Sequence, residues 1–144
     1  MKYWILILLL IVGCGQTVVV QDNDNINPAI EQKFMNDLNY DLEKVALTFD
    51  YKIINYNVPK SIEKVCFIDL DKANDEYPIF NDKHNLEQGY NVYIQRNGAI
   101  LPYLNINTKI VNEKEFVNCI FVIDRQLKLE LEGRGNKVYV KGTD

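Results

Sequence analysis

The sequence is poor in the residues on which most enzymes and metal sites depend. It has one histidine, His84, and three cysteines, with no Cys-x-x-Cys pair, no Gly-x-Ser-x-Gly elbow and no phosphate-cradling glycine loop. A single histidine falls short of the three or four ligands that a zinc site needs. These absences predict a non-enzymatic protein with no catalytic residues, no cofactor and no bound metal.

Positive charge is also scarce. The 16 Lys and Arg residues are outnumbered by 20 Asp and Glu residues, which gives a formal net charge of −4. Nucleic acids and anionic lipid surfaces are bound by a dense Lys/Arg face that releases counterions. The sequence contains no such basic stripe, and a nucleic-acid partner is therefore excluded.

The remaining composition is that of a folded protein. Hydrophobic residues make up 47% of the chain and aromatic residues 11%, which is too many for a disordered chain. The segment 28–144 is long enough for one modest hydrophobic core. We expect a single domain there.

The N-terminus has the pattern of a targeting signal. Lys2 precedes the apolar residues 3–12, and about 10 residues of helix would cover only ~15 Å of a ~30 Å hydrocarbon core. This length suits the hydrophobic region of a signal peptide better than a transmembrane helix.

The residues that end this apolar run are Ile11-Val12-Gly13-Cys14. They resemble the lipobox of bacterial and some archaeal lipoproteins, in which the cysteine thiol receives a diacylglycerol and becomes the new N-terminus. Two acyl chains, such as palmitate, anchor a protein stably without spanning the bilayer.

The lipobox predicts three segments. Residues 1–13 would be a signal peptide, residues 14–27 a lipid-anchored flexible tether rich in Asn and Asp, and residues 28–144 the folded domain. The protein would then be extracytoplasmic and anchored to the cell membrane through Cys14.

Two other interpretations of the N-terminus remain open. If the apolar run continues through residues 17–20, about 18 residues would span ~27 Å as an uncleaved transmembrane helix. The protein would then be a pilin-like or envelope-complex subunit. Plain secretion is the third interpretation. In each case the positive-inside rule places the residues after about 20 outside the cytoplasm, because Lys2 precedes the run and acidic residues follow it.

The compartment affects the other two cysteines. Once Cys14 is lipidated, Cys66 and Cys119 are the two remaining thiols, and both lie in an oxidising compartment. A disulfide between them would close a loop of more than 50 residues, which stabilises a fold by roughly 4 kcal/mol. Two separate buried thiols are the alternative. A catalytic cysteine is disfavoured, because no motif links His84 to either thiol.

The segment after the tether has the pattern of an amphipathic helix. Asn27-Pro28 is typical of an N-cap followed by proline at the first helical position. The spacing predicts a helix over 28–44, with an ambiguous end because residues 47–53 also alternate as a strand would. The apolar stripe recurs every three or four residues, at Ile30, Phe34, Leu38, Leu42, Val45 and Phe49.

The rest of the chain has β patterns. Residues 47–56 and 63–70 are predicted to form a hairpin, residues 71–85 a polar surface loop, and residues 90–101 a second hairpin around a type I′ turn at Asn97-Gly98. Pro102 indicates an edge or bulged strand. Segments 119–123, 127–131 and 137–140 are predicted to form a C-terminal meander. The fold class is α+β, one N-terminal helix packed on an antiparallel sheet of hairpins and the meander.

Two regions of the domain carry a resemblance. Residues 58–67, together with 127–133 and 138–140 of the tail, resemble a loose group of small, membrane-anchored, extracytoplasmic archaeal proteins of unknown function. Many members of that group are pilin-like. The resemblance implies anchoring at the cell surface and no particular activity.

Three sets of residues are site candidates. Asp69 and Asp71, with Asn74, Asp75, Glu76 and Asp82 in the following loop, contain oxygen ligands for a divalent ion but not the EF-hand spacing, which favours solvated loop charges. Asp82 and His84 are at most half of a metal site. Tyr90, Tyr93 and Tyr103 would form an aromatic binding strip, although strand tyrosines more commonly cover the edge of a core.

These observations predict a membrane-anchored extracytoplasmic lipoprotein whose small domain is structural or binds another envelope protein or a glycan. An enzyme that uses Asp69, Asp71 and Asp82 with a divalent ion is the least favoured hypothesis.

Overall fold

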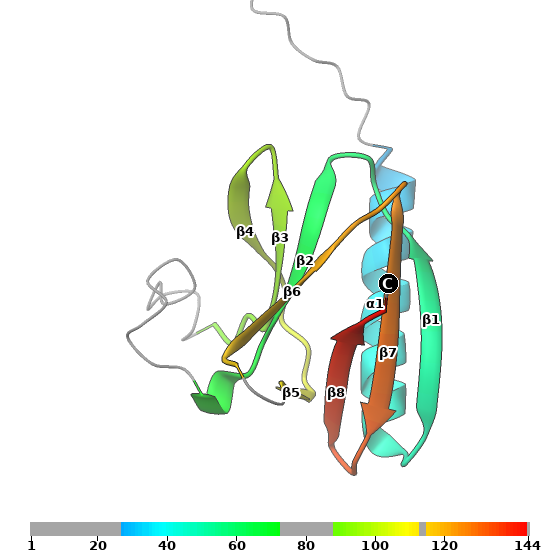
Figure 1. The fold of residues 1–144 in the computed structure, drawn as a ribbon, viewed down its shortest axis with the longest axis vertical. Coiled ribbons are helices and arrows are strands. Elements are labelled where there is room, and N and C mark those ends of the chain that lie inside the picture. The colour runs from blue at the N-terminus through cyan, green and yellow to red at the C-terminus, as the bar shows by residue number, and fades with distance from the viewer. Residues whose placement is uncertain (1–26, 73–87, 113–114, 144) are drawn as a thin grey trace, which may run out of the picture.

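The computed structural model describes residues 27–72, 88–112 and 115–143. One helix and two four-stranded sheets make up this part of the chain (Figure 1). The predicted α+β class is confirmed, and the helix packs on the sheets as expected. The elements are α1 (Pro28–Leu47), β1 (Tyr51–Asn57), β2 (Ile62–Ile68), the 3-10 helix η1 (Leu70–Lys72), β3 (Val92–Arg96), β4 (Ala99–Leu104), β5 (Lys109–Val111), β6 (Val117–Phe121), β7 (Gln126–Gly133) and β8 (Lys137–Gly142).

The helix begins where the sequence predicts. The Asn27 side chain accepts a hydrogen bond from the Ala29 N–H at 3.1 Å, and Pro28 occupies the first turn. The helix ends at Leu47, three residues later than expected, and Leu47 itself is exposed. The apolar stripe of the helix runs into residues 47–53, which also alternate as a strand would. The sequence pattern alone therefore did not mark where the helix ends. Its buried residues are Phe34, Leu38, Leu42, Val45 and Ala46.

The two sheets have the strand orders β1-β7-β8-β5 and β4-β3-β2-β6. The predicted hairpin of residues 47–56 with 63–70 is therefore wrong, because β1 pairs with β7 while β2 pairs with β3 and β6. The segment between β1 and β2 carries the chain from one sheet to the other. Both strands are apolar, and hydrophobic alternation does not specify the partner of a strand.

The C-terminal meander is divided between the sheets. β7 and β8 form the expected antiparallel hairpin, but β6 belongs to the other sheet. The short β5 pairs in parallel with β8, so the first sheet is mixed rather than purely antiparallel. β5 covers only Lys137–Tyr139 of β8. Beyond that point, β8 lies beside β6 of the second sheet: the Asn118 side chain donates to the Val140 carbonyl at 2.9 Å, and Gly142 lies close to Ile120.

A single large core joins the helix to both sheets. Phe34, Leu38 and Leu42 of α1 contact the same buried cluster as Leu129 and Leu131 of β7. That cluster also contains residues of the second sheet, among them Val65, Phe67, Val92 and Ile94. An ion pair from Arg96 at the end of β3 to Glu31 of α1, 2.6 Å long and half-buried, ties the second sheet to the helix.

The turn at Asn97-Gly98 is confirmed. Both residues have positive φ, 50° and 76°, as a type I′ turn requires. Pro102 lies in β4, which is the edge strand of its sheet, and the pairing register shifts between Val92 and Tyr93 opposite it. This bears out the expectation that Pro102 sits in an edge or bulged strand.

A second tight turn lacks glycine. Asp124 and Arg125 both have positive φ, 49° and 63°, in the two-residue connection that leads into β7. A left-handed conformation costs roughly 1 kcal/mol for a residue with a Cβ. Replacing Arg125 with glycine is therefore expected to raise the free energy of unfolding by about 0.5–1 kcal/mol. The Arg125 carbonyl, which accepts the Val58 N–H at 2.9 Å, is retained in this variant.

Chemical denaturation of the full chain measures this effect. Gly98→Ala is the matched opposite change, because no atom lies within 4 Å of the added Cβ and only the backbone conformation is penalised. It should lower stability by about 1 kcal/mol. A loss of stability in Arg125→Gly would show that the arginine side chain outweighs the strain of the turn.

Cys66 and Cys119 form a disulfide. They stand directly opposite each other in the register of β2 and β6, with their Cα atoms 4.0 Å apart. Cys66 is buried and packs with Ile68, Tyr93 and Phe116 on the face of the second sheet that is turned away from the main core. The disulfide therefore fastens the edge strand β6 to the centre of its sheet.

Within the described residues, no helix is long and apolar enough to span a bilayer.

Candidate functional site

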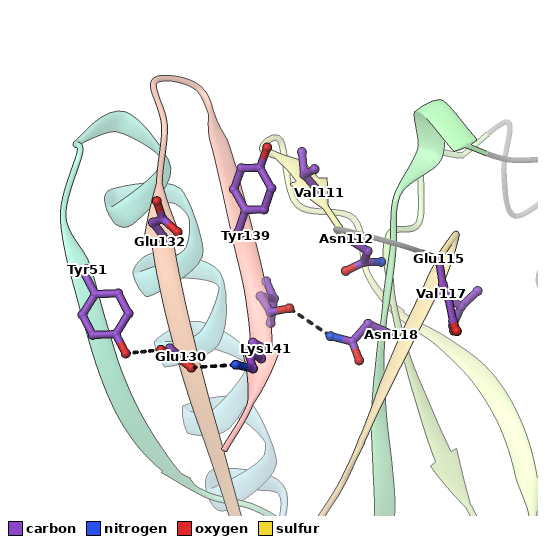
Figure 2. A pocket seen from close by; sticks show the side chains of 11 residues that line it. Tyr51, Val111, Asn112, Glu115, Val117, Asn118, Glu130, Glu132, Tyr139 and Lys141 are labelled. Atoms are coloured by element: carbon purple, nitrogen blue, oxygen red, sulfur yellow. Dashed lines mark hydrogen bonds and ion pairs between the residues drawn. The ribbon is translucent and has the colours of Figure 1, made fainter. Parts of the chain in front are cut away.

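A groove of about 490 Å³ lies between the two sheets. Its floor is the face of the first sheet opposite α1, and its wall comes from β6 and the end of β5 (Figure 2). Within the groove the Asn118 side chain of β6 donates to the Val140 carbonyl of β8 at 2.9 Å, which bridges the two sheets (Figure 2). The lining residues are Tyr51, Val111, Asn112, Glu115, Val117, Asn118, Glu130, Glu132, Tyr139, Val140 and Lys141.

Strand alternation places the floor residues. The leucines of β7 face the core, so Glu130 and Glu132 face the groove. Glu132 stands opposite both Tyr51 of β1 and Tyr139 of β8, and Glu130 stands opposite Lys141. Two carboxylates, two tyrosines and one ammonium are therefore grouped on the floor.

Glu130 is the partly buried carboxylate of the groove. One of its oxygens accepts a hydrogen bond from the Tyr51 hydroxyl, and the other lies 3.9 Å from the Lys141 ammonium (Figure 2). The hydrogen bond to Glu130, more than desolvation, raises the pKa of Tyr51 above its usual range. The Lys141 side chain is 78% exposed, so this ion pair is weak.

Glu132 is already bound by a guanidinium of the same chain. The Arg134 Nε and Nη2 atoms each lie 2.9 Å from the same Glu132 oxygen. The guanidinium carbon of Arg134 also lies 4.6 Å from the centre of the Tyr139 ring. This arrangement combines a charged hydrogen bond with a cation–π contact.

The wall of the groove contains a buried amide. The Asn112 side-chain nitrogen donates to the carbonyls of Phe67 and Phe116, at 3.0 and 3.2 Å. These two bonds orient the amide, and its oxygen points toward the β8 side of the groove (Figure 2). Asn112 is 3% exposed, and no hydrogen-bond donor among the described residues reaches that oxygen. A buried acceptor without a donor is costly.

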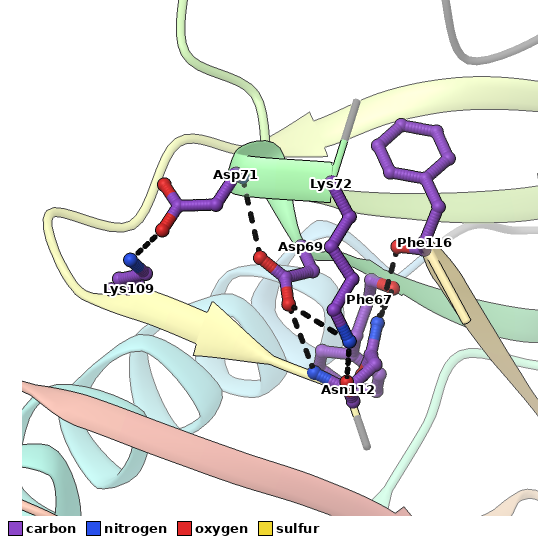
Figure 3. A network of polar contacts seen from close by, with 7 residues as sticks. All are labelled: Phe67, Asp69, Asp71, Lys72, Lys109, Asn112 and Phe116. Atoms are coloured by element: carbon purple, nitrogen blue, oxygen red, sulfur yellow. Dashed lines mark hydrogen bonds and ion pairs between the residues drawn. The ribbon is translucent and has the colours of Figure 1, made fainter. Parts of the chain in front are cut away.

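The backbone of Asn112 is held by a polar network (Figure 3). Asp69, which is 2% exposed, accepts from the Asn112 N–H at 3.4 Å and lies 3.6 Å from the Lys72 ammonium. Lys72 also donates to the Asn112 carbonyl. The network connects η1 with the end of β5, and it keeps the Asn112 amide in place.

The acidic site candidates have structural partners. Asp69 accepts hydrogen bonds and pairs with Lys72, and Asp71 forms an ion pair with Lys109. Among residues 27–72, 88–112 and 115–143, no three His, Cys, Asp or Glu side chains gather closely enough to hold a metal ion. Asn74, Asp75, Glu76, Asp82 and His84 lie outside the described residues, as does the lipobox cysteine Cys14.

The three candidate tyrosines do not form a strip. Tyr93 is buried in the cluster around Cys66, and Tyr90 packs against that cluster. Tyr103 packs in the main core instead, with its ring centre 6.0 Å from that of Phe34. The more common role of strand tyrosines, covering the edge of a core, is the one observed.

The buried hydroxyl of Tyr56 makes the stability of the protein fall at alkaline pH. Burial, assisted by the charge of Asp41 and a 3.1 Å hydrogen bond to it, raises the pKa of the Tyr56 hydroxyl well above its usual value. Burial also raises the pKa of Tyr103. Above pH ~10 the unfolded chain loses these protons while the folded chain keeps them, so the unfolded state binds fewer protons and stability falls as pH rises.

The expected slope is about 1.4 kcal/mol per pH unit for each tyrosine. The free energy of unfolding should be measured with urea at several pH values above 10. Tyr56→Phe should remove about half of the decrease that Tyr56 and Tyr103 together cause. An unchanged slope in Tyr56→Phe would contradict this role for the buried hydroxyl.

The groove was not predicted from the sequence. Strict alternation predicted that Glu130 and Glu132 face solvent, but alternation does not show which segment lies opposite that face of the strand. Asn112 has no local signal, because the Phe67 and Phe116 carbonyls and the wall of the groove come from other segments.

Comparison of the chain with protein-family models, with curated proteins and with solved structures gives no match.

Proposed function

We propose that this protein is a membrane-anchored extracytoplasmic lipoprotein whose α+β domain is a non-enzymatic binding module. Cys14 carries the lipid, residues 14–27 form the tether, and the groove between the two sheets is the binding site. The partner is another component of the cell envelope.

The observation that carries the binding role is the buried Asn112 oxygen in the wall of the groove. Its amide is held by two backbone carbonyls, and a polar network supports its backbone. The oxygen still lacks a donor among the described residues. Binding sites typically combine a preformed concavity with a few positioned polar groups, and this groove has both features.

Two observations support the location. The segment Ile11-Val12-Gly13-Cys14 has the composition and position of a lipobox. The Cys66–Cys119 disulfide belongs to the kind of bond that persists in oxidising compartments outside the cytoplasm. The resemblance to small surface-anchored archaeal proteins agrees with both.

The anchor is tested by the intact mass of the protein extracted from membranes of a lipoprotein-competent host. We expect cleavage before Cys14 and a lipid adduct, with both lost in Cys14→Ser. An uncleaved, unmodified chain would overturn the lipoprotein assignment. It would favour the pilin-like alternative with an N-terminal transmembrane helix.

The groove is tested by photo-crosslinking in native membranes. A photoreactive residue replaces Val117, which lines the groove, and in a matched control it replaces the exposed Glu63 of β2. We expect a defined adduct from position 117 alone. Identical adducts from both positions, or none from either, would contradict a binding role for the groove.

A further inference from the structure

We infer that the groove binds an alkyl-guanidinium group, the chemistry of an arginine side chain. This inference rests on the proposed binding role of the groove and specifies its ligand. The three observations that support it are the charge of the lining, an arrangement that the chain makes with its own Arg134, and the acceptors that remain available.

The lining of the groove is acidic. Glu115, Glu130 and Glu132 supply three carboxylates, and Lys141 is the only ammonium or guanidinium among the lining residues that the structure describes. A cationic ligand is therefore favoured by charge. An anionic ligand would be repelled by the floor.

The chain shows how a guanidinium fits this surface. Arg134 donates through Nε to Glu132, its Nη2 atom lies 2.9 Å from the same oxygen, and its guanidinium lies over the ring of Tyr139. Glu130 is two residues from Glu132 on the same face of β7, and it accepts a hydrogen bond from the hydroxyl of Tyr51, which itself stands opposite Glu132 (Figure 2). The groove thus contains a second carboxylate and tyrosine pair, bordered by Lys141 rather than by an arginine.

The remaining acceptors suit a planar group with several donors. The Glu130 oxygen that faces Lys141 is 3.9 Å from it, longer than a hydrogen bond, and the Asn112 oxygen has no donor among the described residues. Guanidinium presents five N–H donors in a fixed plane and stacks on aromatic rings. An ammonium is a compact, strongly hydrated point charge and matches such a lining less well.

The test is calorimetric titration of the full-length protein in non-ionic detergent. The probes are the blocked tripeptide acetyl-Gly-Arg-Gly-amide, its citrulline analogue, which has the same shape without the charge, and free n-butylguanidine, which has the same single charge. We expect the arginine peptide to bind at least tenfold more tightly than the citrulline peptide, with affinity falling as salt rises.

Three variants locate the binding. Glu130→Gln retains the acceptor for Tyr51 but removes the charge, and it should weaken arginine binding at least fivefold. Lys141→Gln removes the competing ammonium and should strengthen binding. Glu63→Gln, an exposed carboxylate on β2 outside the groove, should have no effect.

Each outcome is decisive for the ligand class. Equal affinity for the arginine and citrulline peptides, no binding of either cation, or binding that is insensitive to Glu130→Gln would overturn the inference. The crosslink from position 117 would still decide the proposed function separately. Equal affinity for n-butylguanidine and the arginine peptide would show that the groove recognises the alkyl-guanidinium alone, which favours a free small molecule as its source. Tighter binding of the peptide would identify a partner protein.

Discussion

Replacing Gly133 with alanine is expected to lower the free energy of unfolding by about 4 kcal/mol. Gly133 is the last residue of β7, at the point where the C-terminal end of α1 meets the first sheet. A Cβ there would overlap the carbonyl oxygens of Val45 and Thr48. These are backbone atoms of the helix end, and they cannot move aside as a side chain can.

The substitution would also weaken the backbone hydrogen bonds around this contact. The Gly133 N–H donates to the Asp50 carbonyl at 2.9 Å, and Thr48 caps the helix by donating its N–H to Val45. Relieving the overlap would displace the helix end, where Val45 is fully buried in the core. Thermal and urea unfolding of the full chain would measure the loss.

Gly142→Ala is the matched control. A Cβ at Gly142 would meet the Cγ2 methyl group of Ile120 at 2.9 Å, and a side-chain atom gives way more readily than a backbone carbonyl. We expect a cost of about 1–2 kcal/mol for this variant. Similar stabilities for the two alanine variants would show that the helix does not approach the sheet as closely as described.

Removal of the disulfide should have an effect of similar size. Cys66 and Cys119 are separated by 53 residues in sequence, and the chain-entropy account gives about 4 kcal/mol for closing such a loop. The double variant Cys66→Ala/Cys119→Ala should therefore unfold at much lower urea concentration than the oxidised protein. The loss should be greatest for β6, which is an edge strand held to β2 by this bond.

Reductant supplies the control for the disulfide. It should destabilise the wild-type protein and leave the double variant unchanged. If oxidised and reduced wild-type protein unfold at the same urea concentration, the two cysteines act as separate thiols. Hydrogen exchange of the β6 amides in the two states would then be the same as well.

Local features of this protein were predictable from neighbouring residues. The Asn27 cap, the apolar stripe from Phe34 to Val45 and the turn at Asn97-Gly98 each depend on contacts within a few positions, and the structure confirms them. Phe49, the last residue of the predicted stripe, lies beyond the helix end and is exposed. The disulfide was expected from the count of cysteines, and it needed only that two strands be neighbours.

Non-local pairing was not predictable in the same way. The apolar and β-branched residues of β1, β2 and β6 predict strands, but they are compatible with any partner of similar polarity. The assignment of β1 to one sheet and of β2 and β6 to the other therefore overturned the expected hairpin and meander.

The sequence by itself determined the helix, the approximate position of most strands, their turns and, in β7, which residues face water, because these properties follow from backbone geometry and short-range periodicity. The same periodicity did not determine the faces of β1, where Tyr51 and Ile53 are exposed. Only the tertiary structure decided that Asn112 of one segment, Tyr51 of β1 and Glu130 of β7 line one groove. The physical reason is that a groove between sheets is created by packing segments that are far apart in the chain, and hydrophobic burial, which drives that packing, is non-directional.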